Sequence, residues 1–316
     1  MAVIGFHAAH EQLLPSQLLR AVQRAEDAGF GAAMCSDHLA PWSERQGESG
    51  NTWVWLGAAL QATSLRFGTV TAPGQRYHPA VHAQQIATVA ELFPGRFWAA
   101  LGSGEQMNEH VTGDVWLPKP ERVERLLECA DVIRRLLDGE EVTHRGSITV
   151  DEAKVWSRPP TPPPLYAAAV SPESAATAAT WADGLITVVQ PMDVLREVLD
   201  EWGGRGPTLL QVHLSWAEDE SEAEAIALDQ CAAAALQDPL PWDLKTPAHF
   251  DAATAAVGVD DLRDAVRISS DLAQHAAWIS ELVEVGFDEV YLHHVGKEQD
   301  AFIDAFGSKV LPELAA

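Results

Sequence analysis

The chain has 316 residues, 47% of them hydrophobic, and its 46 acidic and 21 basic residues give a formal net charge of -25. This charge disfavours nucleic acids and anionic membrane surfaces as partners, because both require a basic footprint. No apolar run approaches the roughly 18 residues of a membrane helix, no signal peptide is expected, and the three cysteines are widely spaced, so we expect a cytoplasmic protein.

Strand-like apolar runs alternate with amphipathic helical segments at intervals of roughly 30 to 40 residues, a pattern typical of βα units. The predicted strands span residues 3–8, 31–36, 66–73, 96–104, 164–170, 183–189, 208–216 and 288–296. The predicted helices span residues 15–29, 51–64, 79–93, 119–139, 172–180, 191–202, 217–236 and 270–286, and residues 301–314 close the chain. Eight strands with intervening helices predict an α/β protein, a (β/α)8 TIM barrel that occupies residues 1–316 as a single domain.

Two segments interrupt this pattern. Residues 140–163 alternate like a small hairpin after the fourth helix, and residues 237–269 form an irregular insertion before the last helix–strand unit. We expect the second insertion to cap the pocket. An open doubly wound sheet is the rival fold, and it is disfavoured because the strand count reaches eight and no GxGxxG motif follows the first strand.

Polar side chains follow the predicted strands, at the end of a barrel where functional groups gather. They include Asp37, His38 and Trp42 in SDHLAPW after the second strand, and Glu105 after the fourth. An imidazole titrates near neutral pH, and a neighbouring carboxylate can fix its tautomer and raise its basicity. The Asp37–His38 pair, with Glu105 as a second proton donor or acceptor, therefore indicates proton transfer to or from an alcohol or carbonyl. The alternative is a structural pair that only bonds its own loop.

Two turns after predicted strands offer backbone N–H groups to an anion. LGSGEQMN, which contains Gly104, is a glycine-rich turn of the kind that forms an anion-binding nest. In VSPESAA, the chain passes from Val170 through Ser171 into a helix whose N-terminus could hold a phosphate. An ordinary loop and an ordinary N-cap explain these turns equally well, and both interpretations stay open.

His7, Trp216 and His293 stand near the ends of the first, seventh and eighth predicted strands, and we expect them to line the substrate pocket. A metal site is not expected, because no HxH motif ends the first strand and the adjacent His293 and His294 point to opposite sides of a strand. A nucleophilic thiol is not expected either, since Cys35 lies inside an apolar run.

Three motifs, SDHLAPW, RFGTVTAPGQRYHPAVHAQ and PGRFWAALGSGEQMNEH, occur in this order along the chain. Together they resemble the bacterial luciferase-like superfamily of flavin-dependent oxidoreductases, and within it the coenzyme F420-dependent glucose-6-phosphate dehydrogenases and their relatives. The resemblance covers nearly the whole chain and is weakest over residues 191–268. It implies the same (β/α)8 barrel, usually as a homodimer.

The resemblance also implies roles for individual residues. His38 matches the catalytic histidine, Trp42 a tryptophan beside the reacting carbon, and Glu105 the proposed acid. The implied cofactor-binding residues are Asp37, Thr69, Val70, Gly104, Asn108, Ala169, Val170 and Ser171. Thr69–Val70 falls where relatives carry a non-prolyl cis peptide, which costs about 3 kcal/mol and persists only where a site requires it.

The chain departs from the sugar-phosphate dehydrogenases at the positions that bind the substrate phosphate. The basic side chains of those relatives fall near Arg196, Asp251 and Ala265, so two of three are missing, with Arg267 a candidate substitute for one. We therefore expect an uncharged alcohol, carbonyl or enone substrate. The ring-contacting residues do not separate coenzyme F420 from FMN, and GFHAAHEQ and SERQGESG look like an FMN-using branch.

The resulting hypothesis is an oxidoreductase that transfers a hydride between F420 or FMN and a small organic substrate. The first alternative is a two-component monooxygenase that uses reduced FMN and oxygen, and a flavin or F420 reductase is then a possible partner. The second alternative is a barrel that binds flavin without catalysis. A metal-dependent hydrolase would instead predict a tightly bound metal.

Overall fold

The computed structural model describes residues 2–314. Eight parallel strands close into a barrel, because β9 pairs with both β8 and β11 and β1 pairs with both β11 and β2. The barrel strands are β1 (Val3–Ala8), β2 (Ala32–Ser36), β3 (Arg66–Thr71), β4 (Phe97–Leu101), β7 (Leu165–Ala168), β8 (Gly184–Val188), β9 (Thr208–Ser215) and β11 (Glu289–His294). The (β/α)8 prediction is confirmed, and each predicted strand is present.

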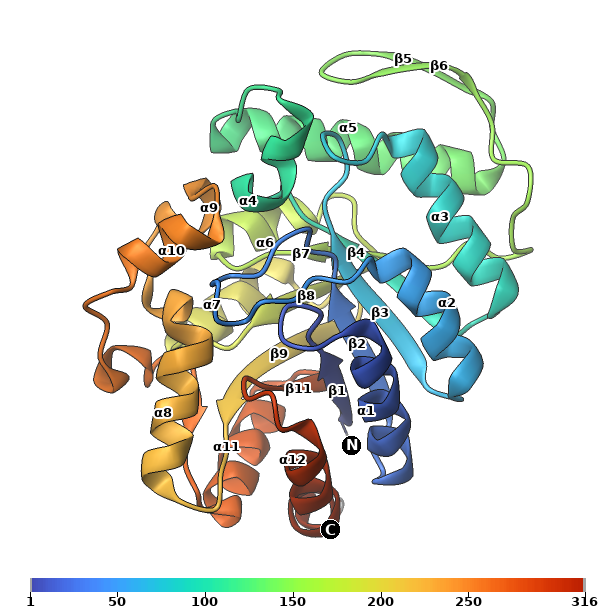
Figure 1. Cartoon of the computed structure of the whole chain (residues 1–316). Coiled ribbons are helices and arrows are strands. Elements are labelled where there is room, and N and C mark those ends of the chain that lie inside the picture. The colour runs from blue at the N-terminus through green and yellow to red at the C-terminus, as the bar shows by residue number, and fades with distance from the viewer. Residues whose placement is uncertain (1, 315–316) are drawn as a thin grey trace.

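Helices surround the barrel on its outside (Figure 1). The helices that alternate with the strands are α1 (Pro15–Asp27), α2 (Thr52–Ala62), α3 (Pro79–Leu92), α5 (Lys119–Asp138), α6 (Pro172–Ala178), α7 (Met192–Trp202), α8 (Glu220–Cys231) and α11 (Leu272–Val285). Shorter elements are α4 (Gln106–Glu109), η1 (His110–Thr112), η2 (Ala232–Ala235), α12 (Gln299–Ala305), η4 (Phe306–Val310) and α13 (Leu311–Leu314). Asp271 caps α11 by accepting a hydrogen bond from the backbone of Ala273, as a helix N-cap does.

Both predicted interruptions are present as excursions from the barrel. The first is an antiparallel hairpin of β5 (Val142–Arg145) and β6 (Thr149–Ala153), which projects from the edge of the molecule (Figure 1). The second contains α9 (Leu240–Asp243), α10 (Pro247–Ala253), η3 (Val259–Leu262) and β10 (Arg267–Ile268). β10 pairs in parallel with Leu214 and Ser215 at the carboxyl end of β9, so the end of the second excursion is tied to the barrel.

Side chains of the barrel strands alternate between the barrel interior and the layer of helices. The closed interior is filled by Ala32, Met34, Trp98, Ala100, Tyr166, Ile186, Leu209 and Tyr291. Gly68 makes room for this layer, since a Cβ at that position would stand 1.9 Å from the Trp98 ring. The opening of the barrel at the carboxyl ends of the strands is called the mouth. The same alternation, continued to those ends, decides which side chains enter it.

The peptide bond between Thr69 and Val70 is trans, so the expected cis bond is wrong; within residues 2–314 the cis peptide is Asp238–Pro239. The physical reason lies in the strand pairing of β3. Val70 is in parallel register with Ser36 on one side and with Ala100 on the other, without a bulge. A regular ladder on both sides is compatible with the ordinary trans geometry.

Candidate active site

His38 lies just past the carboxyl end of β2 with a carboxylate on each side of its ring. Its Nδ1 is 2.9 Å from Oε1 of Glu11, and its Nε2 is 3.5 Å from Oε2 of Glu105. The side chain of Glu11 is only 4% exposed, while that of Glu105 is 19% exposed. Glu11 is absent from the residues predicted from sequence, although it follows the first strand, whose end adjoins that of β2. The signal available in the sequence was that Glu11 is an acidic residue directly after a strand, and that this strand is the neighbour of β2 in the barrel.

The two carboxylates control the charge of His38. Burial opposes a positive charge on this imidazole, but Glu11 and Glu105 outweigh burial and raise the pKa of His38 to about 9. Burial raises the pKa of Glu11, yet His38 outweighs it and lowers that pKa to about 2. Burial raises the pKa of Glu105 against the pull of His38. At neutral pH His38 is therefore a cation, and because Glu11 occupies Nδ1, Nε2 is the nitrogen that can exchange a proton with a ligand.

The carboxylate of Asp37 faces the helices rather than the mouth. Its partners are Trp53 Nε1 at 3.0 Å, Thr71 Oγ1 at 2.9 Å, the Tyr77 hydroxyl at 3.3 Å and the Arg76 guanidinium at 3.5 Å. Adjacent residues of an extended chain point to opposite sides, so Asp37 and His38 cannot share one cavity. Two predictions are thereby corrected: Glu11, not Asp37, orients His38, and the Asp37 side chain is not directed at a ligand in the mouth.

Trp42 packs beside His38 under the second excursion. Its ring centroid is 5.2 Å from that of His38, and also 5.2 Å from that of Phe250 on α10. Phe250 is 1% exposed, so α10 is anchored by a buried aromatic contact. A second tie is the ion pair between Arg45 and Asp251, at 2.9 Å. The excursion therefore borders the loop that carries His38 and Trp42, which is the placement expected of a cap.

The glycine-rich turn after β4 positions Glu105. Gly104 has φ +87°, a left-handed conformation that favours glycine. Asn108 donates from Nδ2 to Oε2 of Glu105 at 2.9 Å, and its Oδ1 accepts from the backbone N–H of Leu39 at 2.8 Å. Asn108 is 4% exposed and thus joins the loops after β2 and β4. In this structure its amide is a positioning group for Glu105.

The remaining predicted cofactor positions lie on β3 and after β7. Thr69 is fully buried, and the alternation directs its side chain toward the helices, whereas Val70 is partly exposed and packs against the interior layer. Ser171 is the N-cap of α6 and accepts from the backbone N–H of Ser174. Ala169 is buried, and Val170 and Ser171 are partly exposed.

Three imidazoles form the polar floor of the mouth. The rings of His7 and His293 stack with centroids 4.3 Å apart, and the ring of His213 lies 4.9 Å from that of His293. His7 and His293 were predicted from sequence, whereas His213 and its neighbour Gln211 were not assigned a role. His213 lies two residues after the inward-facing Gln211 on β9, so the period of two directs it into the mouth.

Trp216 lies outside this group of imidazoles. Its Nε1 donates to the carbonyl of Ser270 at 3.2 Å, and its ring meets Phe306 edge-on at 6.3 Å. The prediction that Trp216 lines the substrate pocket is therefore corrected. The reason is again the alternation along β9: Gln211 and His213 face inward, so Trp216 faces the helices.

Buried neutral imidazoles should make the protein sensitive to acid. Burial lowers the pKa of His7 to about 3, and it lowers those of His10, His82 and His213 to about 4. In the unfolded chain these groups titrate near about 6.5, so below that pH the unfolded state binds more protons than the folded state. We expect the melting temperature to fall steadily from pH 7 to pH 5, and scanning calorimetry at constant ionic strength measures it. An unchanged melting temperature over this interval would contradict the burial of neutral imidazoles.

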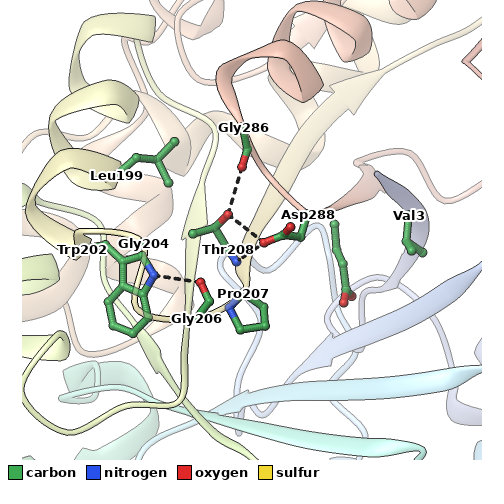
Figure 2. A pocket seen from close by; sticks show the side chains of 10 residues that line it. Val3, Leu199, Trp202, Gly204, Gly206, Pro207, Thr208, Gly286 and Asp288 are labelled. Atoms are coloured by element: carbon green, nitrogen blue, oxygen red, sulfur yellow. Dashed lines mark hydrogen bonds between the residues drawn. The ribbon is translucent and has the colours of Figure 1, made fainter. Parts of the chain in front are cut away.

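A separate hollow of about 650 Å³ lies at the opposite end of the barrel, around the amino ends of β1, β9 and β11 (Figure 2). Its polar groups are engaged with one another. The Thr208 hydroxyl donates to the carbonyl of Gly286 at 3.2 Å, and Trp202 Nε1 donates to the carbonyl of Gly206 at 3.1 Å. The backbone N–H of Thr208 donates to Asp288 at 2.8 Å. Polar groups at this end of a TIM barrel contribute to stability rather than to chemistry.

Within residues 2–314, no group of three or more His, Cys, Asp or Glu side chains is arranged to hold a metal ion. In the floor, the rings of His7 and His293 stack, and the ring of His213 is tilted against that of His293. No helix in the same span is both long enough and apolar enough to cross a bilayer.

Comparisons with known proteins identify the family of this chain. The family described as luciferase-like monooxygenase matches residues 2–289. The chain belongs to the luciferase-like monooxygenase family. Among curated members, F420-dependent hydroxymycolic acid dehydrogenase of Mycobacterium tuberculosis is 32% identical, with 98% of this chain and 88% of that protein covered. F420-dependent glucose-6-phosphate dehydrogenase of Nakamurella multipartita is 31% identical, with 99% and 96% covered.

Solved structures of two F420-dependent enzymes have the same fold. An F420-dependent secondary alcohol dehydrogenase, solved in complex with an F420-acetone adduct, superposes with a TM-score of 0.90 at 28% identity, with 99% of each chain covered. The coenzyme F420-dependent tetrahydromethanopterin reductase of Methanopyrus kandleri superposes with a TM-score of 0.76 at 21% identity and shares the fold.

Proposed function

We propose that this luciferase-like protein is an F420-dependent oxidoreductase that moves a hydride between F420 and a small, uncharged alcohol or carbonyl compound. The observation that carries the proposal is His38, held between Glu11 and Glu105 at the mouth of the barrel. A charged imidazole with one accessible nitrogen is suited to exchange a proton with an alcohol oxygen. Similarity over nearly the whole chain to proteins named F420-dependent dehydrogenases supports F420 as the cofactor.

Small side chains beside His38 fit a flat ring system. Gly102 presents no side chain to the wall, and a Cβ there would come into ordinary contact, 3.6 Å, with the Cβ of Ala168. Val70 and Ala168, both partly exposed, pack on the interior layer and provide an apolar base. Val70, Gly102, Ala168 and the turn of Val170 and Ser171 would hold the cofactor. The deazaflavin ring, when bound, supplies the two-electron hydride chemistry.

The chain's own contribution is the handling of a proton at one atom. In the oxidative direction, neutral His38 accepts the hydroxyl proton of the alcohol at Nε2 as the hydride leaves the carbinol carbon. In the reductive direction, protonated His38 donates from Nε2 to the carbonyl oxygen. Glu11 keeps the ring oriented through Nδ1 and compensates its charge. Trp42 and Phe250 shield this proton transfer from water on the side of the second excursion.

Uncharged substrates are favoured because the basic positions of sugar-phosphate relatives are not used in the mouth. Arg196 lines a hollow in the outer helical layer together with Met192 and Glu281. Asp251 is acidic and pairs with Arg45. Arg267, the candidate substitute, donates to the carbonyls of its own loop at 3.3 and 3.5 Å. A phosphate has no comparable cation cluster to bind among these residues.

Titration of the purified protein with F420 and with FMN, each oxidised and reduced and followed by fluorescence, tests the cofactor. We expect tight binding of F420 and weak binding of FMN. Tight binding of reduced FMN together with oxygen uptake would instead support the two-component monooxygenase. Tight binding of either ring without turnover of any alcohol or carbonyl would support the non-catalytic carrier.

The proposal also covers the domain organisation, the cellular location and the oligomeric state of the enzyme. The chain acts as one catalytic domain of residues 1–316, in the cytoplasm, where its three free cysteines stay reduced. We also propose a homodimer, as the family resemblance implies. Exposed Val54 on α2 and Val81 on α3 offer apolar surface on the neighbouring helices where a second copy could pack.

A further inference from the structure

A chain of hydrogen bonds with a fixed direction crosses the floor of the mouth. It begins at the carbonyl of Val295, which accepts from Nε2 of Gln12. Because Nε2 of Gln12 is the donor there, its Oε1 is an acceptor. Nε2 of His293 lies 3.0 Å from this oxygen and must carry a hydrogen. The backbone carbonyl thus fixes which nitrogen of His293 is protonated.

The next step relies on the neutrality of the imidazoles. Burial lowers the pKa of His293 well below its ordinary value, and burial lowers that of His213 to about 4. Each ring therefore carries a single hydrogen at neutral pH. In His293 that hydrogen is on Nε2, so its Nδ1 is an acceptor.

Gln211 lies between His293 and His213 and extends the order of hydrogen-bond donors and acceptors from one ring to the other. Its Nε2 is 3.2 Å from Nδ1 of His293 and 3.2 Å from Nε2 of His213, and one amide nitrogen can donate to both. Nε2 of His213 is consequently an acceptor, and the one hydrogen of this ring resides on Nδ1. Within residues 2–314, Nδ1 of His213 forms no hydrogen bond and is not a fully buried atom. The chain ends in a donor that is available to a ligand.

Among the residues that the structure describes, the wall around the floor offers a ligand no unpaired cation. By strand alternation, the side chains directed into the mouth are His7, Ser36, His38, Val70, Ala168, Val188, Gln211, His213 and His293. Neither Lys nor Arg occurs among these described positions. The charge of His38 is balanced by Glu11 and Glu105, and Arg76 is engaged by Asp37 and Glu109. The floor therefore recognises a neutral oxygen better than an anion.

We infer that Nδ1–H of His213 binds a second oxygen of the substrate, so that the enzyme prefers uncharged compounds with a hydroxyl, ether or carbonyl oxygen besides the reacting group. The inference rests on the proposed function and names its substrate class. Contacts link His213 to the end of β2 that carries His38: its ring lies 4.9 Å from that of His293, which stacks on His7 at 4.3 Å. Nε2 of His7 is in turn 3.3 Å from the hydroxyl of Ser36, two residues before His38. A site built to pair with a polar group discriminates against the analogue that lacks it, because the donor is then left unpaired.

The test compares isopropanol with propylene glycol, which has the same three-carbon skeleton and one more hydroxyl. With F420 bound, we expect kcat/KM of the wild type to favour propylene glycol by about tenfold, the value of one hydrogen bond to a desolvated group. His213→Leu should remove most of this ratio. His213→Asn should restore it, because the amide N–H can occupy nearly the position of Nδ1–H. Because both alcohols are assayed on the same preparation, the ratio of their kcat/KM values does not depend on the fraction of folded enzyme.

His144→Leu is the matched control, since His144 lies on the β5–β6 hairpin and pairs with Glu128 away from the mouth. It should keep the wild-type ratio. A wild-type ratio near one, or the same ratio in wild type and His213→Leu, overturns the inference while leaving the proposed function intact. Oxidation of neither alcohol, although F420 binds, overturns the proposed function and the inference together.

Discussion

His38→Ala is expected to lower kcat for alcohol oxidation by about 10²-fold or more, while the Kd for F420 changes little. The physical reason is the loss of the group that exchanges a proton at Nε2, and a positioned acid or base contributes about 10²- to 10⁴-fold. The cofactor wall, which includes Val70 and Gly102, is untouched by the substitution. Steady-state kinetics and a fluorescence titration with F420 on the same preparation measure the two effects separately.

The control for this variant is His144→Ala, which removes an imidazole that pairs with Glu128 on the hairpin. It should retain wild-type kcat. Wild-type kcat in His38→Ala would end the assignment of His38 as the proton-exchanging group. Equal losses of F420 binding and of turnover would instead mean that His38 serves the binding of cofactor.

Glu11→Gln is expected to move the pH dependence of alcohol oxidation to lower pH and to lower its maximal rate. Oxidation needs neutral His38, so in the wild type the rate should rise with pH toward the raised pKa of about 9. A nearby negative charge favours the protonated imidazole, and its removal lowers the pKa of His38. The midpoint should therefore fall by about one unit or more, and ketone reduction, which needs protonated His38, should lose its activity at a correspondingly lower pH than in the wild type. The pH profiles of kcat in both directions measure this.

Glu105→Gln provides a graded comparison for this prediction. Glu105 is 3.5 Å from His38, farther than Glu11 at 2.9 Å, and its side chain is more exposed, so its removal should shift the profile less. Glu140→Gln, at a surface pair with Arg135, is the matched control and should leave the profile unchanged. An unshifted midpoint in Glu11→Gln would contradict the pairing of Glu11 with the proton-exchanging imidazole.

The barrel was predictable because its strands are covered on both faces and therefore appear as continuous apolar runs. The runs through Phe6 and through Leu292 were recognisable without knowledge of their neighbours, and the hairpin was recognisable from its alternation. The registers and the trans Thr69–Val70 bond were less accessible, since they depend on how β3 pairs with β2 and β4. Local sequence carries little information on such pairing.

Sequence could place a residue of the candidate site where one strand end sufficed, but not where two strand ends had to be combined. His38 and Glu105 each follow a strand, and that position alone made them candidates. The choice between Asp37 and Glu11 as the partner of His38 depends on which side of β2 each side chain takes, and on the closeness of β1 and β2 in space. Sequence proximity favoured Asp37, but the alternation of side chains turns it toward Trp53 on α2.

The most direct test of the central claim is to add isopropanol, in the absence of oxygen, to the F420-titrated protein and to follow the absorbance of oxidised F420. The account predicts reduction of F420 with one acetone formed for each F420 consumed, and loss of this reaction in His38→Ala. A protein that binds F420 without reducing it, or that turns over only with reduced FMN and oxygen, would contradict the account.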